Sequence, residues 1–177
     1  MFCLVLINDQ TIASGSFDTT IKLWNLSFIE EQGIIIEDQA SKILLGHVAP
    51  VNCLILINKQ TIASGSFDNT IKLWNITTEK VIRTLTGHTR GVLCLILLNE
   101  KTTLVSGCEE SKIKFWNITT GELIRTLVHD NDDDYCASVT CFQLLNDNQS
   151  LISGSLDETI KVWNTKNGEL IKSIEGH

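Results

Sequence analysis

One stretch of this chain occurs twice almost unchanged, and this repetition constrains the fold more than any other feature. Residues 10–25 read QTIASGSFDTTIKLWN, and residues 60–75 differ from them at one position, Thr19 against Asn69. Two divergent copies follow, LVSGCEESKIKFWN ending at Asn117 and LISGSLDETIKVWN ending at Asn164. Internal repetition at a roughly fixed period is typical of repeat architectures. We therefore expect one domain, residues 1–177, with repeats at approximately 1–45, 46–86, 87–127 and 128–175.

Each repeat has the pattern of four β-strands. In the second, the apolar run Val51–Ile57 ends at a polar turn, and TIASGS leads through another turn into TIKLWN. Alternation in TIKLWN favours a strand, and Lys80–Leu85 supplies the fourth. A single four-stranded antiparallel unit cannot bury both of its faces, but units packed face to face around an axis can. The sequence therefore predicts an all-β protein, a β-propeller with four blades.

Short motifs at the borders of the repeats identify a family. Gly-His precedes a first strand at Gly46-His47 and Gly87-His88, and Val128-His129 takes its place in the next linker. Every third strand ends in Trp-Asn, at Trp24, Trp74, Trp116 and Trp163. Four copies in phase are specific where one would be weak, and the chain resembles the WD-repeat family. The resemblance implies a propeller of four-stranded antiparallel blades, of which this chain holds four, as a complete or a partial ring.

The resemblance also implies a hydrogen-bonded tetrad of His, Ser, Asp and Trp within each blade. Two serines per repeat alternate onto one face, so the sequence leaves the choice between Ser64 and Ser66, and between Ser153 and Ser155, open. The third repeat departs from the pattern, with Glu110 at the Asp position and Cys108 at the second serine, and we expect its network to be strained or water-filled. The matching sets are Ser14, Asp18, Trp24 and the distant His177; His47, Ser64, Asp68 and Trp74; His88, Ser106, Glu110 and Trp116; and His129, Ser153, Asp157 and Trp163.

Catalysis and metal binding are not expected. Ser, His and Asp also form hydrolytic triads, but an enzyme needs one nucleophile, whereas this set recurs in every repeat. The cysteines at equivalent strand positions lie on four different blades and cannot converge on a metal, while Cys108 and Cys136 have no partner at short spacing. The acidic run 130–134 departs from a calcium loop at Tyr135 and Cys141. We predict no cofactor, no metal and no enzyme activity.

Charge and cysteine content limit the partners and the compartment. The net charge of -7 disfavours binding to nucleic acid or to anionic membranes. The opening segment MFCLVLI lacks a basic flank and is too short to span a bilayer, so we read it as a strand. Six cysteines without a signal peptide fit a reducing compartment, the cytoplasm or the nucleus.

Partners of the family dock mostly on the face built from the linkers before first strands and the turns before third strands. Here that face would combine apolar side chains with an acidic flank, which suits proteins or peptides carrying hydrophobic anchors and basic charge. The residues concerned are Phe17, Phe67, Glu109 and Leu156 in the turns, and Pro50, Asn52, Arg90, Leu93, Tyr135, Ser138 and Thr140 in the linkers.

We therefore expect an interaction scaffold within a larger assembly. The alternative is the substrate-recognition propeller of a ubiquitin-ligase-type complex that reads phosphopeptides, which requires clustered arginines. The chain has only Arg83, Arg90 and Arg125, so this function ranks lower.

The two ends of the chain are complementary. The first repeat lacks Gly-His, whereas Gly176-His177 begins a further repeat. Three alternatives follow: a ring that closes on itself through His177, two chains that associate, or a region that needs additional blades. The extra residues around Ile34–Ile36 make the first repeat irregular and favour the third alternative.

Overall fold

The chain is all-β, as the sequence predicted. The computed structural model describes residues 3–29, 33–36, 39–98, 102–129, 137–145 and 149–175. These residues form seventeen strands and no helix. The acidic run 130–134, Tyr135, Cys136 and the terminal Gly176-His177 lie outside the described residues, so the predictions made for them stay predictions.

The strands form four antiparallel sheets in sequence order, here called blades 1 to 4. Consecutive strands pair throughout blades 2 to 4, which confirms the predicted four-stranded units. Blade 1 contains β1 (Cys3–Asn8), β2 (Thr11–Gly15), β3 (Ile21–Ile29), β4 (Gly33–Ile36) and β5 (Lys42–Leu44). Blade 2 contains β6 (Val51–Asn58), β7 (Thr61–Ser66), β8 (Ile71–Asn75) and β9 (Lys80–Leu85). Blade 3 contains β10 (Val92–Leu97), β11 (Thr103–Cys108), β12 (Lys112–Asn117) and β13 (Leu123–Val128). Blade 4 contains β14 (Val139–Leu144), β15 (Ser150–Ser155), β16 (Thr159–Asn164) and β17 (Leu170–Glu175).

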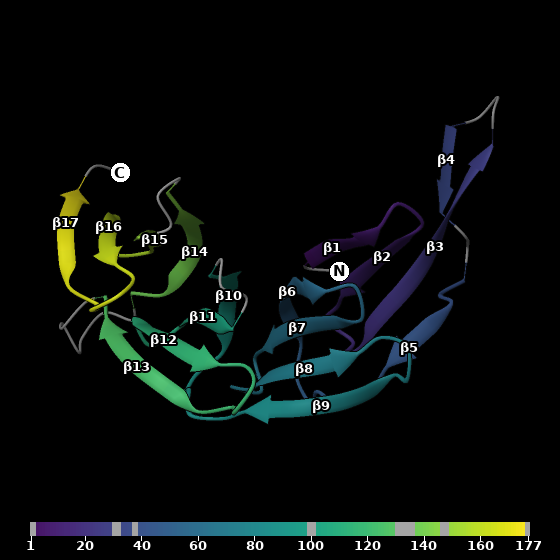
Figure 1. The fold of residues 1–177 in the computed structure, drawn as a ribbon, viewed down its shortest axis with the longest axis horizontal. Helices are drawn as coiled ribbons and strands as arrows, with labels where there is room; N and C mark the ends of the chain where they lie inside the picture. The colour runs from purple at the N-terminus through teal and green to yellow at the C-terminus, as the bar shows by residue number, and fades with distance from the viewer. Residues whose placement is uncertain are drawn as a thin grey trace.

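The four blades stand along an open arc with blades 1 and 4 at its two ends (Figure 1). The first strands line its inner side, where β6 lies against both β1 and β10, and β10 against β14. Among the described residues, blade 4 does not pack against blade 1. The alternative in which this chain closes on itself is therefore wrong for the described part of the fold.

The irregularity of the first repeat is a hairpin extension of blade 1. The strand β3 pairs with β5 in its first half, Ile21 opposite Leu44, and with β4 in its second half, Leu26 opposite Ile36. The β4 hairpin points away from the arc, and β5 takes the outer position of the blade (Figure 1). The extra residues of the first repeat thus leave the four-stranded plan of the blade in place.

Three apolar cores lie between neighbouring blades, and each contains the tryptophan of the later blade. Trp74 packs against blade 1, Trp116 against blade 2 and Trp163 against blade 3. Their exposed fractions are 0%, 1% and 5%. Trp24 is only half-buried, because no sheet precedes blade 1 in the described chain. Each of blades 2 to 4 therefore needs its predecessor to bury the tryptophan of its third strand.

The one difference between the near-identical repeats falls at a left-handed turn position. The residue after the turn acid has positive φ in each blade, 71° at Thr19 and 67° at Asn69. Asparagine tolerates this conformation, whereas a β-branched residue is strained in it.

We expect Thr19→Asn to raise the free energy of unfolding by about 1 kcal/mol, measured by urea denaturation. The reciprocal Asn69→Thr should lower it, and by more, since Asn69 also donates to the Thr89 carbonyl. A loss of stability in Thr19→Asn would contradict this account of the turn.

Candidate functional site

In blades 2 to 4, the linker before the first strand is bonded to the turn between the second and third strands. The amide of the residue before the turn acid donates to a linker carbonyl: Phe67 to Pro50 at 3.0 Å, Glu109 to Gly91 at 3.1 Å, and Leu156 to Ser138 at 3.0 Å. Linker and turn thus form one continuous edge of each blade, which we call the linker–turn edge. The bonds give this edge a fixed backbone from which its side chains project.

A chain of buried side chains supports this edge in blade 2. The Trp74 indole N–H donates to Ser64 Oγ at 2.7 Å, and Ser64 Oγ lies 2.7 Å from His47 Nε2. His47 Nδ1 lies 2.6 Å from Asp68 Oδ2. Ser66 points elsewhere: its hydroxyl donates to the Ala49 carbonyl and accepts the Asp68 amide. Of the two serines that the sequence left open, Ser64 joins tryptophan to histidine.

Burial sets the protonation of this chain. It lowers the pKa of His47 below its ordinary 6.5, against the opposing hydrogen bond and charge of Asp68. Burial acts to raise the pKa of Asp68, but hydrogen bonds from Thr70, His47 and Val48 outweigh it and hold that pKa below 3.8. At neutral pH His47 is therefore uncharged, its Nδ1–H donates to the Asp68 carboxylate, and the Ser64 hydroxyl donates to Nε2.

Acid should destabilise the protein, beginning near pH 6.5. The folded-state pKa of His47 lies below 6.5, so below that pH the unfolded chain takes up a proton that the folded chain does not. Asp68 acts in the same direction below its ordinary value of 3.8. We expect the free energy of unfolding to fall by up to about 1.4 kcal/mol per pH unit for His47. Urea denaturation between about pH 7.5 and 5 measures this slope. His47→Gln should reduce this slope by up to about 1.4 kcal/mol per pH unit, which is the contribution of one proton. An unchanged slope in that variant would contradict the assignment to His47.

Blade 3 keeps the tryptophan–serine–histidine bonds of this network and alters the pair of histidine and acid. Trp116 donates to Ser106 at 2.8 Å, and Ser106 Oγ lies 2.7 Å from His88 Nε2. The longer Glu110 side chain accepts from the Thr89 amide and hydroxyl and from Lys112 at 2.8 Å, and these bonds hold its pKa at about 2 although burial acts to raise it. Its Oε1 stays 3.5 Å from His88 Nδ1, which has no hydrogen-bond partner among the described residues.

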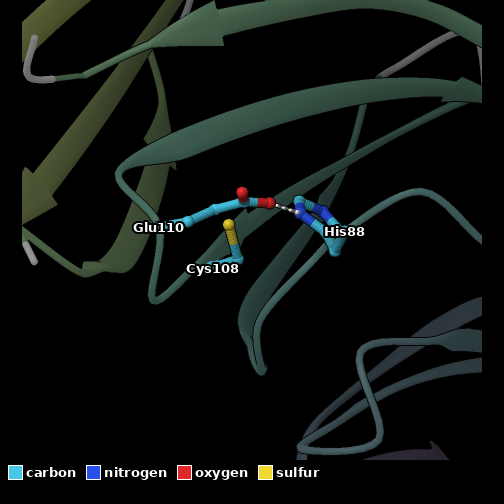
Figure 2. Close-up of side chains that lie close together, drawn as sticks. All are labelled: His88, Cys108 and Glu110. Atoms are coloured by element: carbon cyan, nitrogen blue, oxygen red, sulfur yellow. Dashed lines mark ion pairs between the residues drawn. The ribbon is translucent and has the colours of Figure 1, made fainter. Parts of the chain in front are cut away.

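The fold places Cys108 beside this altered pair (Figure 2). The His88, Cys108 and Glu110 ligand atoms all lie within 4.8 Å of one another. Sequence reasoning found no short-spaced partner for Cys108 and missed this cluster, because His88 comes from a linker twenty positions earlier. The available signal was that the third repeat departs from the pattern at two network positions at once.

In blades 1 and 4 the described residues form only part of this hydrogen-bonded network. In blade 1 Trp24 donates to Ser14 at 2.8 Å, while Asp18 accepts from the amide and hydroxyl of Thr20. Its predicted histidine, His177, lies outside the described residues. In blade 4 Trp163 donates to Ser153 at 2.8 Å, and His129 Nδ1 lies 3.0 Å from Asp157. His129 Nε2 has no hydrogen-bond partner among the described residues. Ser153 thus takes the place of Ser64, and Ser155 accepts the Asp157 amide as Ser66 accepts that of Asp68.

The comparison with protein families agrees with this geometry. The model of the WD domain, G-beta repeat, matches residues 3–25, 39–75, 79–117 and 121–164, so that each match ends at the Trp-Asn of a third strand. The chain belongs to the WD-repeat family. No curated protein matches its sequence. WD repeats generally mediate protein–protein interaction. The described part of this WD-repeat chain contains no helix long and apolar enough to cross a membrane.

The residues expected on the docking face of the WD-repeat chain differ widely in exposure. Phe17 and Leu156 are each 69% exposed, and Phe67, whose ring lies against Gly91, is 39% exposed. Two residues are turned inward: Ser138 is buried, and the Asn52 amide donates to the Val92 carbonyl of the next blade. Arg90 and Thr140 are exposed, Pro50, Leu93 and Glu109 are half-buried, and Tyr135 lies outside the described residues.

Among the described residues, the most exposed apolar side chain of this edge is one that sequence reasoning missed. Val48 follows the Gly-His pair of blade 2 and is 86% exposed, while its amide donates to Asp68 at 3.2 Å. Its position directly after His47 was the available signal, since a residue next to a buried linker histidine is held at the edge.

Proposed function

We propose that this WD-repeat region is a protein–protein interaction module that binds a peptide or protein on its linker–turn edge. The observation that carries the proposal is the exposure of Val48 and Leu156 on a hydrogen-bonded backbone, together with that of Phe17 in the equivalent turn of blade 1. Large apolar side chains on rigid turns are suited to anchor a partner, because little conformational entropy is lost when they are covered.

The charge near these anchors indicates the chemistry of the partner. Asp18 and Glu158 are exposed in the turns beside Phe17 and Leu156. Together with the net charge of -7, they favour a segment with apolar anchors flanked by lysine or arginine. Nucleic acid and anionic membranes do not fit this surface.

We also propose that the chain has no catalytic activity. Among the described residues, the hydroxyls that accept a tryptophan N–H belong to Ser14, Ser64, Ser106 and Ser153; all four residues are buried, the last three fully. Each accepts an indole N–H, so each works as a structural link between strands. A nucleophile must reach its substrate, which these serines do not.

Recognition of phosphopeptides as part of a ubiquitin-ligase-type complex remains the second candidate. It requires several arginines on the binding edge. Arg83 donates to the carbonyls of Thr119 and Thr120, and Arg125 donates to that of Lys166, so both are engaged on the outer strands. Arg90 alone remains for the edge, and we place this function below the first.

The free thiols of the five described cysteines fit the proposed cytoplasmic or nuclear location.

The test is an affinity pull-down from the source cell with the double variant Phe17→Ser, Val48→Ser. We expect the partner to be lost while the melting temperature stays within a few degrees of the unaltered protein. The matched control is Ile82→Ser, Ile171→Ser, which removes two apolar side chains of about half exposure from the outer strands β9 and β17. A partner that is kept by the first variant and lost by the control would place the interaction on the outer strands.

A further inference from the structure

The altered network of blade 3 gathers three different metal-ligating groups in one small buried region. His88 comes from the linker before β10, Cys108 ends β11, and Glu110 lies in the following turn. Their nitrogen, sulfur and oxygen atoms lie within 4.8 Å of one another, and the three side chains converge in Figure 2. Cys108 is fully buried, and the side chain of Glu110 is 10% exposed.

The ring of His88 presents Nδ1 to this region, 3.5 Å from Glu110 Oε1. Its side chain is 1% exposed, and Nδ1 has no hydrogen-bond partner in the described chain. The other ring nitrogen is fixed by Ser106, which itself accepts from Trp116. When Nε2–H donates to Ser106, the serine hydroxyl donates onward to the Lys114 carbonyl at 3.4 Å, and the Nδ1 lone pair faces Cys108 and Glu110.

We infer that His88 Nδ1, Cys108 Sγ and a Glu110 carboxylate oxygen form a binding site for one divalent transition-metal ion of the zinc class. Imidazole, thiolate and carboxylate are the ligands that zinc takes in proteins. Ser106 supplies the second hydrogen bond that orients a ligating histidine. This site is independent of the proposed partner binding, since none of its three side chains belongs to the exposed anchors.

The cluster can contract onto an ion with small movements. Metal–ligand distances of about 2.0–2.3 Å place neighbouring donor atoms about 3.3–3.8 Å apart in a tetrahedral site. Glu110 Oε1 is already 3.5 Å from His88 Nδ1. Oε2 can keep its bond to Lys112 while Oε1 turns to the ion. Coordination replaces the thiol proton of Cys108, which passes to the solvent, and it leaves the fourth position of the ion to water.

Two substitutions test the site without disturbing the fold. In blade 2 the positions of Cys108 and Glu110 are held by Ser66 and Asp68, so Cys108→Ser, Glu110→Asp gives blade 3 residues that a neighbouring blade already accommodates. The matched control is Cys141→Ser, which removes an exposed thiol from blade 4. The proteins are reduced, freed of metal with a chelator, and titrated with Zn²⁺ by calorimetry. Co²⁺ then reports on thiolate ligation through its charge-transfer absorption.

We expect one Zn²⁺ per chain in the unaltered protein and in Cys141→Ser, with a higher melting temperature when the ion is bound. The double variant should melt cooperatively and bind Zn²⁺ at least about a hundred-fold more weakly, without the cobalt–thiolate band. Equal Zn²⁺ binding by the double variant, loss of binding in Cys141→Ser, or no binding by the unaltered protein would each overturn the proposal.

Discussion

Replacing Trp74 with alanine should lower the free energy of unfolding by about 3–5 kcal/mol. Its indole is fully buried between blades 1 and 2, where it packs with Ile21 and Ile62. The substitution removes this apolar contact and opens a cavity that a close-packed interface fills only in part. It also deprives Ser64 of the N–H that it accepts.

Trp24→Ala is the matched control for this prediction. Trp24 makes the same hydrogen bond to its serine, at 2.8 Å, but is only half-buried. Urea denaturation of both variants should show a loss for Trp24→Ala that is smaller by more than about 1 kcal/mol. Equal losses would mean that burial by the preceding blade is not the source of the effect.

Ser64→Ala should cost about 2–4 kcal/mol, a large effect for the loss of one hydroxyl. It leaves both the Trp74 N–H and His47 Nε2 without a partner in a region closed to water, and each unsatisfied buried group costs about 1–3 kcal/mol. The removed atom is small, so the change in packing adds little.

The equivalent Ser14→Ala separates the two contributions to this cost. Ser14 accepts from Trp24, and the described part of blade 1 offers it no histidine. Thermal and urea unfolding should therefore give a smaller loss than Ser64→Ala, by roughly the cost of one unsatisfied nitrogen. If both alanine variants lose the same stability, His47 contributes nothing to the stability of this hydrogen-bonded network.

The strands, the four-stranded blades and the family could be predicted because their signals are local and repeated. Alternation along TIKLWN and the turns on either side of it fix a strand without reference to the rest of the chain. The choice between Ser64 and Ser66 could not be made in this way. Both serines point to one face of β7, and only the position of the His47 ring, held by a linker, shows which of them meets it.

The linkers limited what the sequence could say about the candidate site. Asn52 and Ser138 lie on the expected loops, yet one bonds to the next blade and the other is buried. The approach of His88 to Cys108 depends on the path of a linker in the same way. The conformation of such segments is set by contacts with distant residues, which a periodic pattern does not encode.

The way the blades meet has a consequence for how such a chain can change in length. Each interface joins the tryptophan face of one sheet to the opposite face of the sheet before it, as Trp74 and Trp116 do in turn. Such head-to-tail contacts are heterologous, so a single repeat carries both halves of the interface. A repeat copied in tandem therefore meets a matching surface on each side. The near-identity of residues 10–25 and 60–75 fits a gene that has gained a blade by internal duplication without needing new contacts to hold it.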